Sequence, residues 1–106
     1  MLNTLNESES VGYEIERNGE IIYDKSKLKD GDDIVLKVYY DGTDKADVYT
    51  ALYNQNGMLN MVKKEGLNDN TAKFELHIDK VSDIKSWKIF VWNSDLMPLS
   101  HEVVII

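Results

Sequence analysis

The sequence predicts an all-β fold, an antiparallel β-sandwich of about seven or eight strands. Three observations favour it. Apolar and polar side chains alternate with a period of two in run after run, turn residues separate the runs, and a sustained helical spacing is hard to find. With 106 residues and no cysteine, the chain has the length of one domain that core packing alone must stabilise.

The domain is expected to span residues 11–106. The first ten residues, MLNTLNESES, are rich in Asn, Ser and Glu, which predicts a linker or a disordered N-terminal arm. They lack the basic and apolar regions of a signal peptide. No apolar run approaches the roughly 20 residues of a membrane-spanning helix, so membrane insertion is not expected.

Two hairpins are marked by Asn-Gly pairs, which favour type I′ turns because both residues tolerate positive φ. The first pair, Asn18-Gly19, lies between GYEIER and EIIYD, and the second, Asn56-Gly57, follows a strand that ends near Tyr53.

Regular alternation predicts further strands in DDIVLKVYY and TAKFELHID, each with one buried face. SWKIFVW and HEVVII complete the set. Strands of this length and spacing favour an immunoglobulin-like or fibronectin-III-like sandwich over a barrel.

The charge balance argues against nucleic acid as a partner. Acidic residues outnumber basic ones 19 to 12, and the lysines are scattered among acids, whereas phosphate binding needs clustered Lys and Arg. The acidic loops DGDD and DGTDKAD offer oxygen ligands to calcium but do not match the EF-hand spacing. Asp and Gly also serve turn geometry, so we expect no metal site and no cofactor.

The run from Trp87 to Trp92 raises the question of a binding surface. On a strand, Trp87 shares one face with Ile89 and Val91, and Trp92 shares the other with Phe90. Because buried aromatic residues dominate sandwich cores, we expect Phe90 and Trp92 between the sheets and Trp87 half exposed at the start of the strand. Trp87, Tyr39 and Tyr49 are the candidate ligand-binding residues.

Several short motifs resemble a known family. VYTALYNQNGML, and then WKIFVWNSDLMPLS some thirty residues later, resemble the Ig-like, fibronectin-III-like domains of secreted multimodular proteins of clostridia and related Firmicutes. Members of that family carry Asp where this chain has Asn54 and Asn93. The resemblance implies a non-catalytic accessory or spacer domain in a larger secreted or cell-surface protein.

Catalysis is not expected, because neither His77 nor His101 has a neighbouring Ser, Cys or carboxylate in the spacing of an activated nucleophile. Three functions remain open. The first is a spacer whose partners are the neighbouring domains of a longer chain. The second is a carbohydrate-binding module that stacks exposed aromatic rings on a polysaccharide. The third is a protein-docking module that uses the apolar C-terminal run HEVVII as an edge strand.

Overall fold

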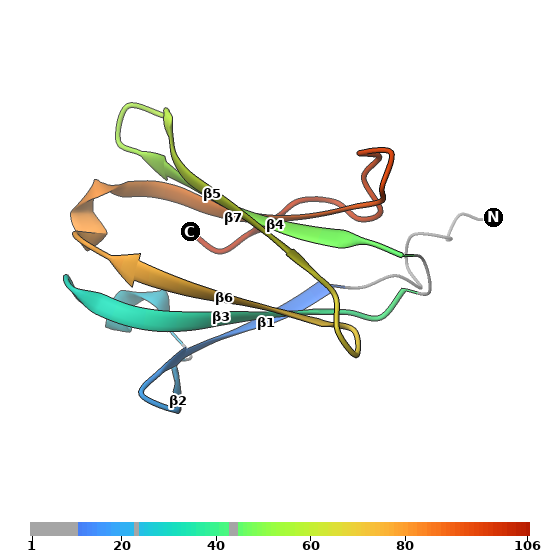
Figure 1. Ribbon diagram of the computed structural model, residues 1–106. Helices are drawn as coiled ribbons and strands as arrows, with labels where there is room; N and C mark the ends of the chain where they lie inside the picture. Colours follow the sequence, from blue (N-terminus) through green and yellow to red (C-terminus); the bar gives the residue numbers. More distant parts are fainter. Residues whose placement is uncertain (1–10, 23, 43–44) are drawn as a thin grey trace.

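The computed structural model describes residues 11–22, 24–42 and 45–106. Two antiparallel four-stranded sheets face each other, as Figure 1 shows, so the predicted all-β sandwich is confirmed. Sheet A has the strand order β2 (Glu20–Ile22), β1 (Val11–Arg17), β3 (Asp32–Tyr40), β6 (Thr71–Ile78). Sheet B has the order β5 (Leu59–Gly66), β4 (Asp47–Asn54), β7 (Ile84–Trp92), β8 (Val103–Val104). Two 3-10 turns, η2 (Lys25–Lys27) and η3 (Val81–Asp83), lie in the connections.

The structure begins with β1 at Val11, and the predicted arm of residues 1–10 lies outside the described residues. No helix among the residues described is long and apolar enough to cross a membrane.

The first hairpin forms as predicted. Asn18 and Gly19 have φ values of 55° and 83° between β1 and β2, the positive values that a type I′ turn requires. Arg17 ties this hairpin to the next segment, since its guanidinium donates to Asp32 Oδ2 at 2.7 Å and to the Lys27 carbonyl at 3.0 Å. Partial burial alone would raise the pKa of Asp32, but the Lys29 N–H and Arg17 together hold it below its ordinary value.

Sheet A follows the predicted alternation. The side chains that point between the sheets are buried and apolar: Ile15, Ile34, Leu36, Val38, Tyr40, Ala72, Phe74, Leu76 and Ile78. The opposite face carries charged side chains at the intervening positions, including the Lys37–Glu16 ion pair at 2.7 Å. Sheet A therefore has one apolar face and one strongly polar face.

In sheet B the expected orientation of β7 is wrong. Trp87, Ile89 and Val91 are buried in the inter-sheet core, at 0%, 0% and 1% exposure, whereas Phe90 and Trp92 lie on the outer face. Trp87, predicted to be half exposed, is thus fully buried, and the two predicted core aromatics face outward.

The physical reason is a polar partner for the indole. Trp87 Nε1 donates to Thr50 Oγ1 at 2.7 Å, and the Thr50 hydroxyl donates to the Lys88 carbonyl at 3.1 Å. Thr50, on β4, is 0% exposed. Among the described residues it is the single polar or charged residue that is buried. Among these residues, no buried side-chain nitrogen or oxygen lacks a hydrogen-bond partner. The inward position therefore satisfies the indole N–H while its rings fill the core.

Thr50→Val tests this arrangement. Valine keeps the shape of threonine but removes the hydroxyl, which leaves the buried Trp87 N–H without an acceptor. We expect a loss of about 1–3 kcal/mol in the free energy of unfolding, measured by urea denaturation. The matched control is Thr71→Val, at a partly exposed outer position of β6, with a change within about 0.5 kcal/mol. Equal effects of the two substitutions would contradict the role of Thr50.

Candidate functional site

The three residues predicted to bind a ligand do not come together. Trp87 is fully buried and offers no surface to a ligand. Tyr39 lies on the outer face of sheet A, 36% exposed, and its hydroxyl donates to Glu14 Oε1 at 2.9 Å, which raises the pKa of Tyr39. Tyr49 lies on the opposite side of the molecule, on the outer face of sheet B. The predicted set is therefore spread over three separate environments.

An aromatic cluster nevertheless covers sheet B, and Tyr49 is part of it. Tyr49 pairs with Phe90 across β4 and β7. The ring centroids of Tyr49 and Trp92 are 4.9 Å apart, and those of Phe90 and Trp92 are 5.4 Å apart. All three side chains are partly exposed. We call Tyr49, Phe90 and Trp92 the outer aromatic cluster.

The sequence does contain a signal for this cluster. Lys88 has the same strand parity as Phe90 and Trp92, and a lysine is rarely buried between sheets. The face of β7 that carries Lys88 is therefore the one expected to meet solvent. Ile89 and Val91, both β-branched, share the other parity with Trp87 and suit a core position.

Charged side chains on the outer face of sheet B form ion pairs with one another. Lys64 lies 3.6 Å from Asp47, and Lys88 lies 3.3 Å from Glu102. Lys88 Nζ also lies 5.5 Å from the centroid of the Tyr53 ring, within range of a cation–π interaction. The strands of sheet B thus present an apolar surface whose lysines are locally neutralised.

Two loops with the same hydrogen-bond pattern flank the outer aromatic cluster. In residues 54–58, Asn54 Oδ1 accepts the N–H groups of Asn56 and Met58, and in residues 93–97, Asn93 Oδ1 accepts those of Asp95 and Met97. Each Asn also donates its own N–H to the carbonyl of the methionine four residues later, at 2.9 Å in both loops. These are Asx-turn geometries, in which the side chain replaces a backbone acceptor.

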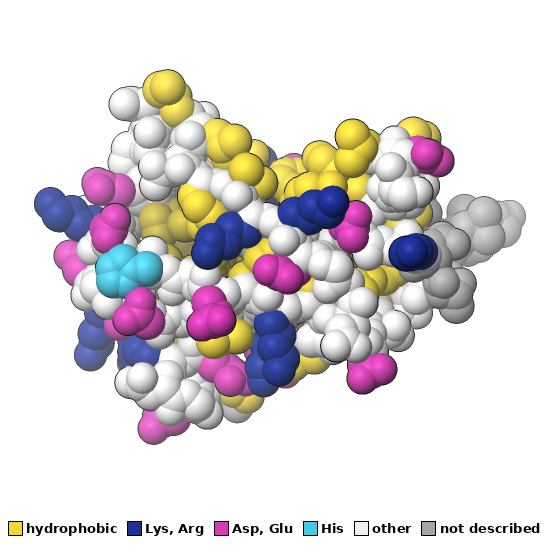
Figure 2. All heavy atoms as spheres, in the orientation of Figure 1, with side chains coloured by type: hydrophobic (Ala, Val, Ile, Leu, Met, Phe, Trp, Pro, Cys, Tyr) yellow, Lys and Arg dark blue, Asp and Glu magenta, His cyan; other side chains and the backbone are white. Residues whose placement is uncertain are grey.

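Both loops display apolar side chains to solvent. Met58 and Leu59 are 64% and 56% exposed, and Leu96 and Met97 are 63% and 59% exposed. In Figure 1 the two loops rise from opposite ends of sheet B, on its outer side. Figure 2 shows hydrophobic side chains gathered along this side and the surface hollowed between the two raised ends. We call this surface, the outer aromatic cluster with its two loops, the sheet B saddle.

The rings of the cluster are poorly arranged for a sugar platform. The Trp92 ring is tilted by 44° from the Tyr49 ring and by 43° from the Phe90 ring, so the three rings do not form one flat stacking surface. A packed, tilted aromatic cluster with exposed methionines is the composition found at the centre of protein interfaces.

The C-terminal run is only partly an exposed edge. Val104 is 54% exposed on β8, but Ile105 is 3% exposed, and its N–H donates to the Trp87 carbonyl at 2.7 Å. The run pairs with β7 along one side and contributes to the core.

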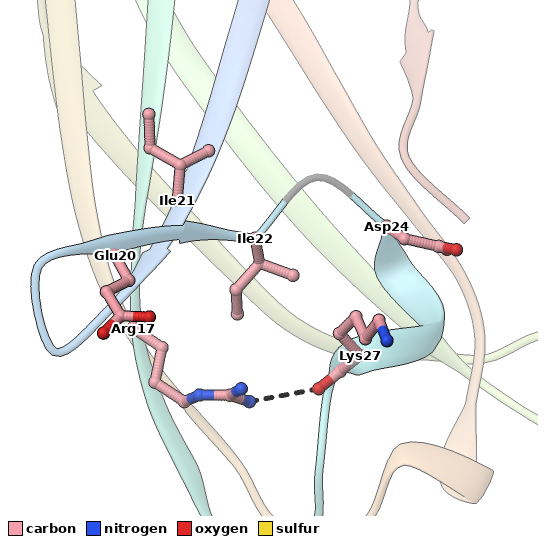
Figure 3. A pocket seen from close by; sticks show the side chains of 6 residues that line it. All are labelled: Arg17, Glu20, Ile21, Ile22, Asp24 and Lys27. Carbon is pink, nitrogen blue, oxygen red and sulfur yellow. Dashed lines mark hydrogen bonds between the residues drawn. The ribbon is translucent and has the colours of Figure 1, made fainter.

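A small pocket of about 240 Å³ lies between β2 and η2 (Figure 3). Six side chains line it: Arg17, Glu20, Ile21, Ile22, Asp24 and Lys27. Figure 3 shows the Arg17 guanidinium reaching across the pocket to the Lys27 carbonyl. Because this guanidinium also pairs with Asp32, its charge is already satisfied, and the volume is below the roughly 300 Å³ of ordinary ligand sites.

A histidine lies between two carboxylates on sheet A. His77 Nδ1 is 2.7 Å from Asp33 Oδ1, and Nε2 is 3.2 Å from Asp79 Oδ1. No group of three or more His, Asp or Glu within the described ranges is placed to hold a metal ion. The acidic loop DGTDKAD is described only in part, because residues 43 and 44 lie outside those ranges.

Comparison of the chain with protein-family models, with curated proteins and with solved structures finds no match.

The carboxylates around His77 predict a pH dependence. The hydrogen bond to Asp33, followed by the charges of Asp33 and Asp79, raises the pKa of His77 above 6.5. The folded protein therefore holds this proton more tightly than the unfolded chain does. The stabilisation is complete below the unfolded pKa and disappears as the pH rises through the folded pKa.

We expect the NMR titration of the His77 ring to shift to lower pH in Asp33→Asn. The stability difference between wild type and this variant should shrink between about pH 5 and pH 8. An unchanged His77 titration in Asp33→Asn would contradict the assignment.

Proposed function

We propose that this chain is a non-catalytic accessory domain, immunoglobulin-like or fibronectin-III-like, of a larger secreted or cell-surface protein. Its role is to hold neighbouring domains apart and to present them. The observation that carries the proposal is the placement of the ends of the sandwich. β1 starts toward one end of the strands, where Val11 pairs with Tyr40, and Ile106 lies beside Trp87, toward the other end (Figure 1). Chain segments that joined these positions would leave in opposite directions, as a spacer requires.

The strand arrangement supports the immunoglobulin-like assignment. In the constant-type sandwich, the first, second and fifth strands lie in one sheet, and the third, sixth and seventh lie in the other. If the short strand β2 is set aside as an addition to the first hairpin, β1, β3 and β6 lie in sheet A, and β4, β7 and β8 lie in sheet B. β5, the fourth strand in this count, departs from the constant-type order, in which the fourth strand joins the first sheet; here it lies next to β4 in the second sheet.

The interior supports a mechanical role. The core is continuous from Ile15 on β1 to Ile105 beside β7, and strand pairing joins every named strand to a neighbour. A close-packed core with hydrogen-bonded strands transmits force and position between attached domains with little internal motion.

An immunoblot of the source cells tests this proposal. Antibodies raised against the 12.2 kDa domain should detect a much larger protein in the medium or cell-surface fraction, because an accessory domain is one module of a longer chain. A cytosolic marker protein, followed in the same fractions, controls for lysis. A band at 12.2 kDa confined to the cell interior would overturn the proposal.

A further inference from the structure

We infer that the sheet B saddle binds a second copy of this chain, so that two sandwiches pack face to face with their strands crossing at about a right angle. This inference goes beyond the proposed function and does not depend on it, because both a free domain and a domain within a longer chain would expose the same saddle.

The composition of the saddle is that of an interface centre. Apart from three residues of sheet A (Tyr13, Ile21 and Tyr39), the large apolar side chains that are exposed among the described residues belong to sheet B or its loops: Met58, Leu59, Val62, Leu96, Met97 and Val104. They surround the outer aromatic cluster. Aromatic residues and methionine are enriched at interface centres, and methionine adapts its shape to a facing surface.

One of these residues occupies a strained backbone position. Leu96 has a φ of 62°, and the equivalent position of the sister loop is Gly57, with a φ of 78°. Glycine suits the left-handed region, whereas a leucine there is disfavoured. Since Leu96 is also 63% exposed, it adds nothing to the core that would offset this strain. Non-glycine residues in such conformations cluster at functional sites, and a contact between two copies would offset the strain at Leu96.

The distribution of charge favours a second copy at the sheet B saddle over the outer face of sheet A. The chain carries a net charge of -7, so two copies repel each other in general. The outer face of β1, β3 and β6 carries four carboxylates and two lysines: Glu14, Glu16, Asp33, Glu75, Lys37 and Lys73. The saddle instead pairs Lys64 with Asp47 and Lys88 with Glu102. With Asp95 of the 93–97 loop, the saddle has one negative charge in excess, against two on the outer face of sheet A, so two copies repel each other less at the saddle.

Shape sets the crossing angle. If the strands of the two copies were parallel, the raised loops of one copy would meet those of the other and hold the sheets apart. At a right angle, the loops of each copy straddle the edges of the other sheet. Four strands span about 14 Å between the outer strand axes, and eight residues of β4 separate the loops by about 23 Å. One sheet fits between the loops of its partner, with Val62 of β5 and Val104 of β8 beside the partner's methionines.

The available area suits an interface of modest size. The three long strands β5, β4 and β7, with the two-residue β8, cover roughly 400 Å², and the two loops enlarge this face toward the roughly 800 Å² that each partner contributes to a standard interface. A two-fold axis makes the contact isologous, with the same residues on both sides.

Sedimentation velocity of the 106-residue chain, over a dilution series from submillimolar to micromolar, tests the inference. Wild type should shift from dimer to monomer on dilution. Val62→Lys and Val104→Lys, which place a charge at either edge of the saddle, should weaken dimerisation by about tenfold or more, because each lysine is desolvated at the contact.

The matched control is Ile21→Lys, since Ile21 is 41% exposed on sheet A, and this variant should dimerise like wild type. Unfolding midpoints of all three variants establish that the fold is retained. A wild type that stays monomeric at every concentration overturns the inference. The saddle would then be a binding surface for a different protein or for a glycan. A dimer that survives both saddle lysines, or that Ile21→Lys weakens equally, overturns it as well.

Discussion

The hydrogen bond from the Trp87 indole to the Thr50 hydroxyl is the contact on which the orientation of sheet B depends. It joins the two central strands of that sheet inside the core, 37 residues apart in sequence. A slip of one residue in the register would move every side chain of β7 to the opposite face and would leave the buried Thr50 hydroxyl without its Trp87 donor. Either face of β7 is apolar enough to pack in the core. The hydrogen bond between Trp87 and Thr50 favours the register that places Trp87 inside.

The outer surface follows from that choice. With Trp87, Ile89 and Val91 between the sheets, Phe90 and Trp92 must face outward, where they meet Tyr49. The Asn54 and Asn93 loops then bound the cluster at its two ends. Sheet A, with its charged outer face, and sheet B, with its apolar saddle, give the sandwich two unlike sides.

Much of the fold was predictable because local signals agreed with tertiary packing. The Asn18-Gly19 turn and the alternation in β3 and β6 each specify a strand and its buried face. The orientation of β7 was mispredicted because its residues from Trp87 to Trp92 are apolar on both parities, so that within this run only Lys88 distinguishes the faces. The same ambiguity made Trp87 a candidate ligand-binding residue, since it was expected to be half exposed and is instead fully buried. The paired asparagine loops depend on side-chain acceptors, which hydrophobic patterning does not detect.

The measurement that tests the account most directly is acrylamide quenching of two variants with one tryptophan each, Trp92→Phe and Trp87→Phe, at protein concentrations where the chain is monomeric. In Trp92→Phe the remaining Trp87 should emit at short wavelength and resist quenching, because it is 0% exposed. In Trp87→Phe the remaining Trp92 should emit at longer wavelength and be quenched readily, since it is partly exposed. The reverse assignment, with a protected Trp92 and a quenchable Trp87, would place the opposite face of β7 in the core and would contradict both the Thr50 contact and the saddle.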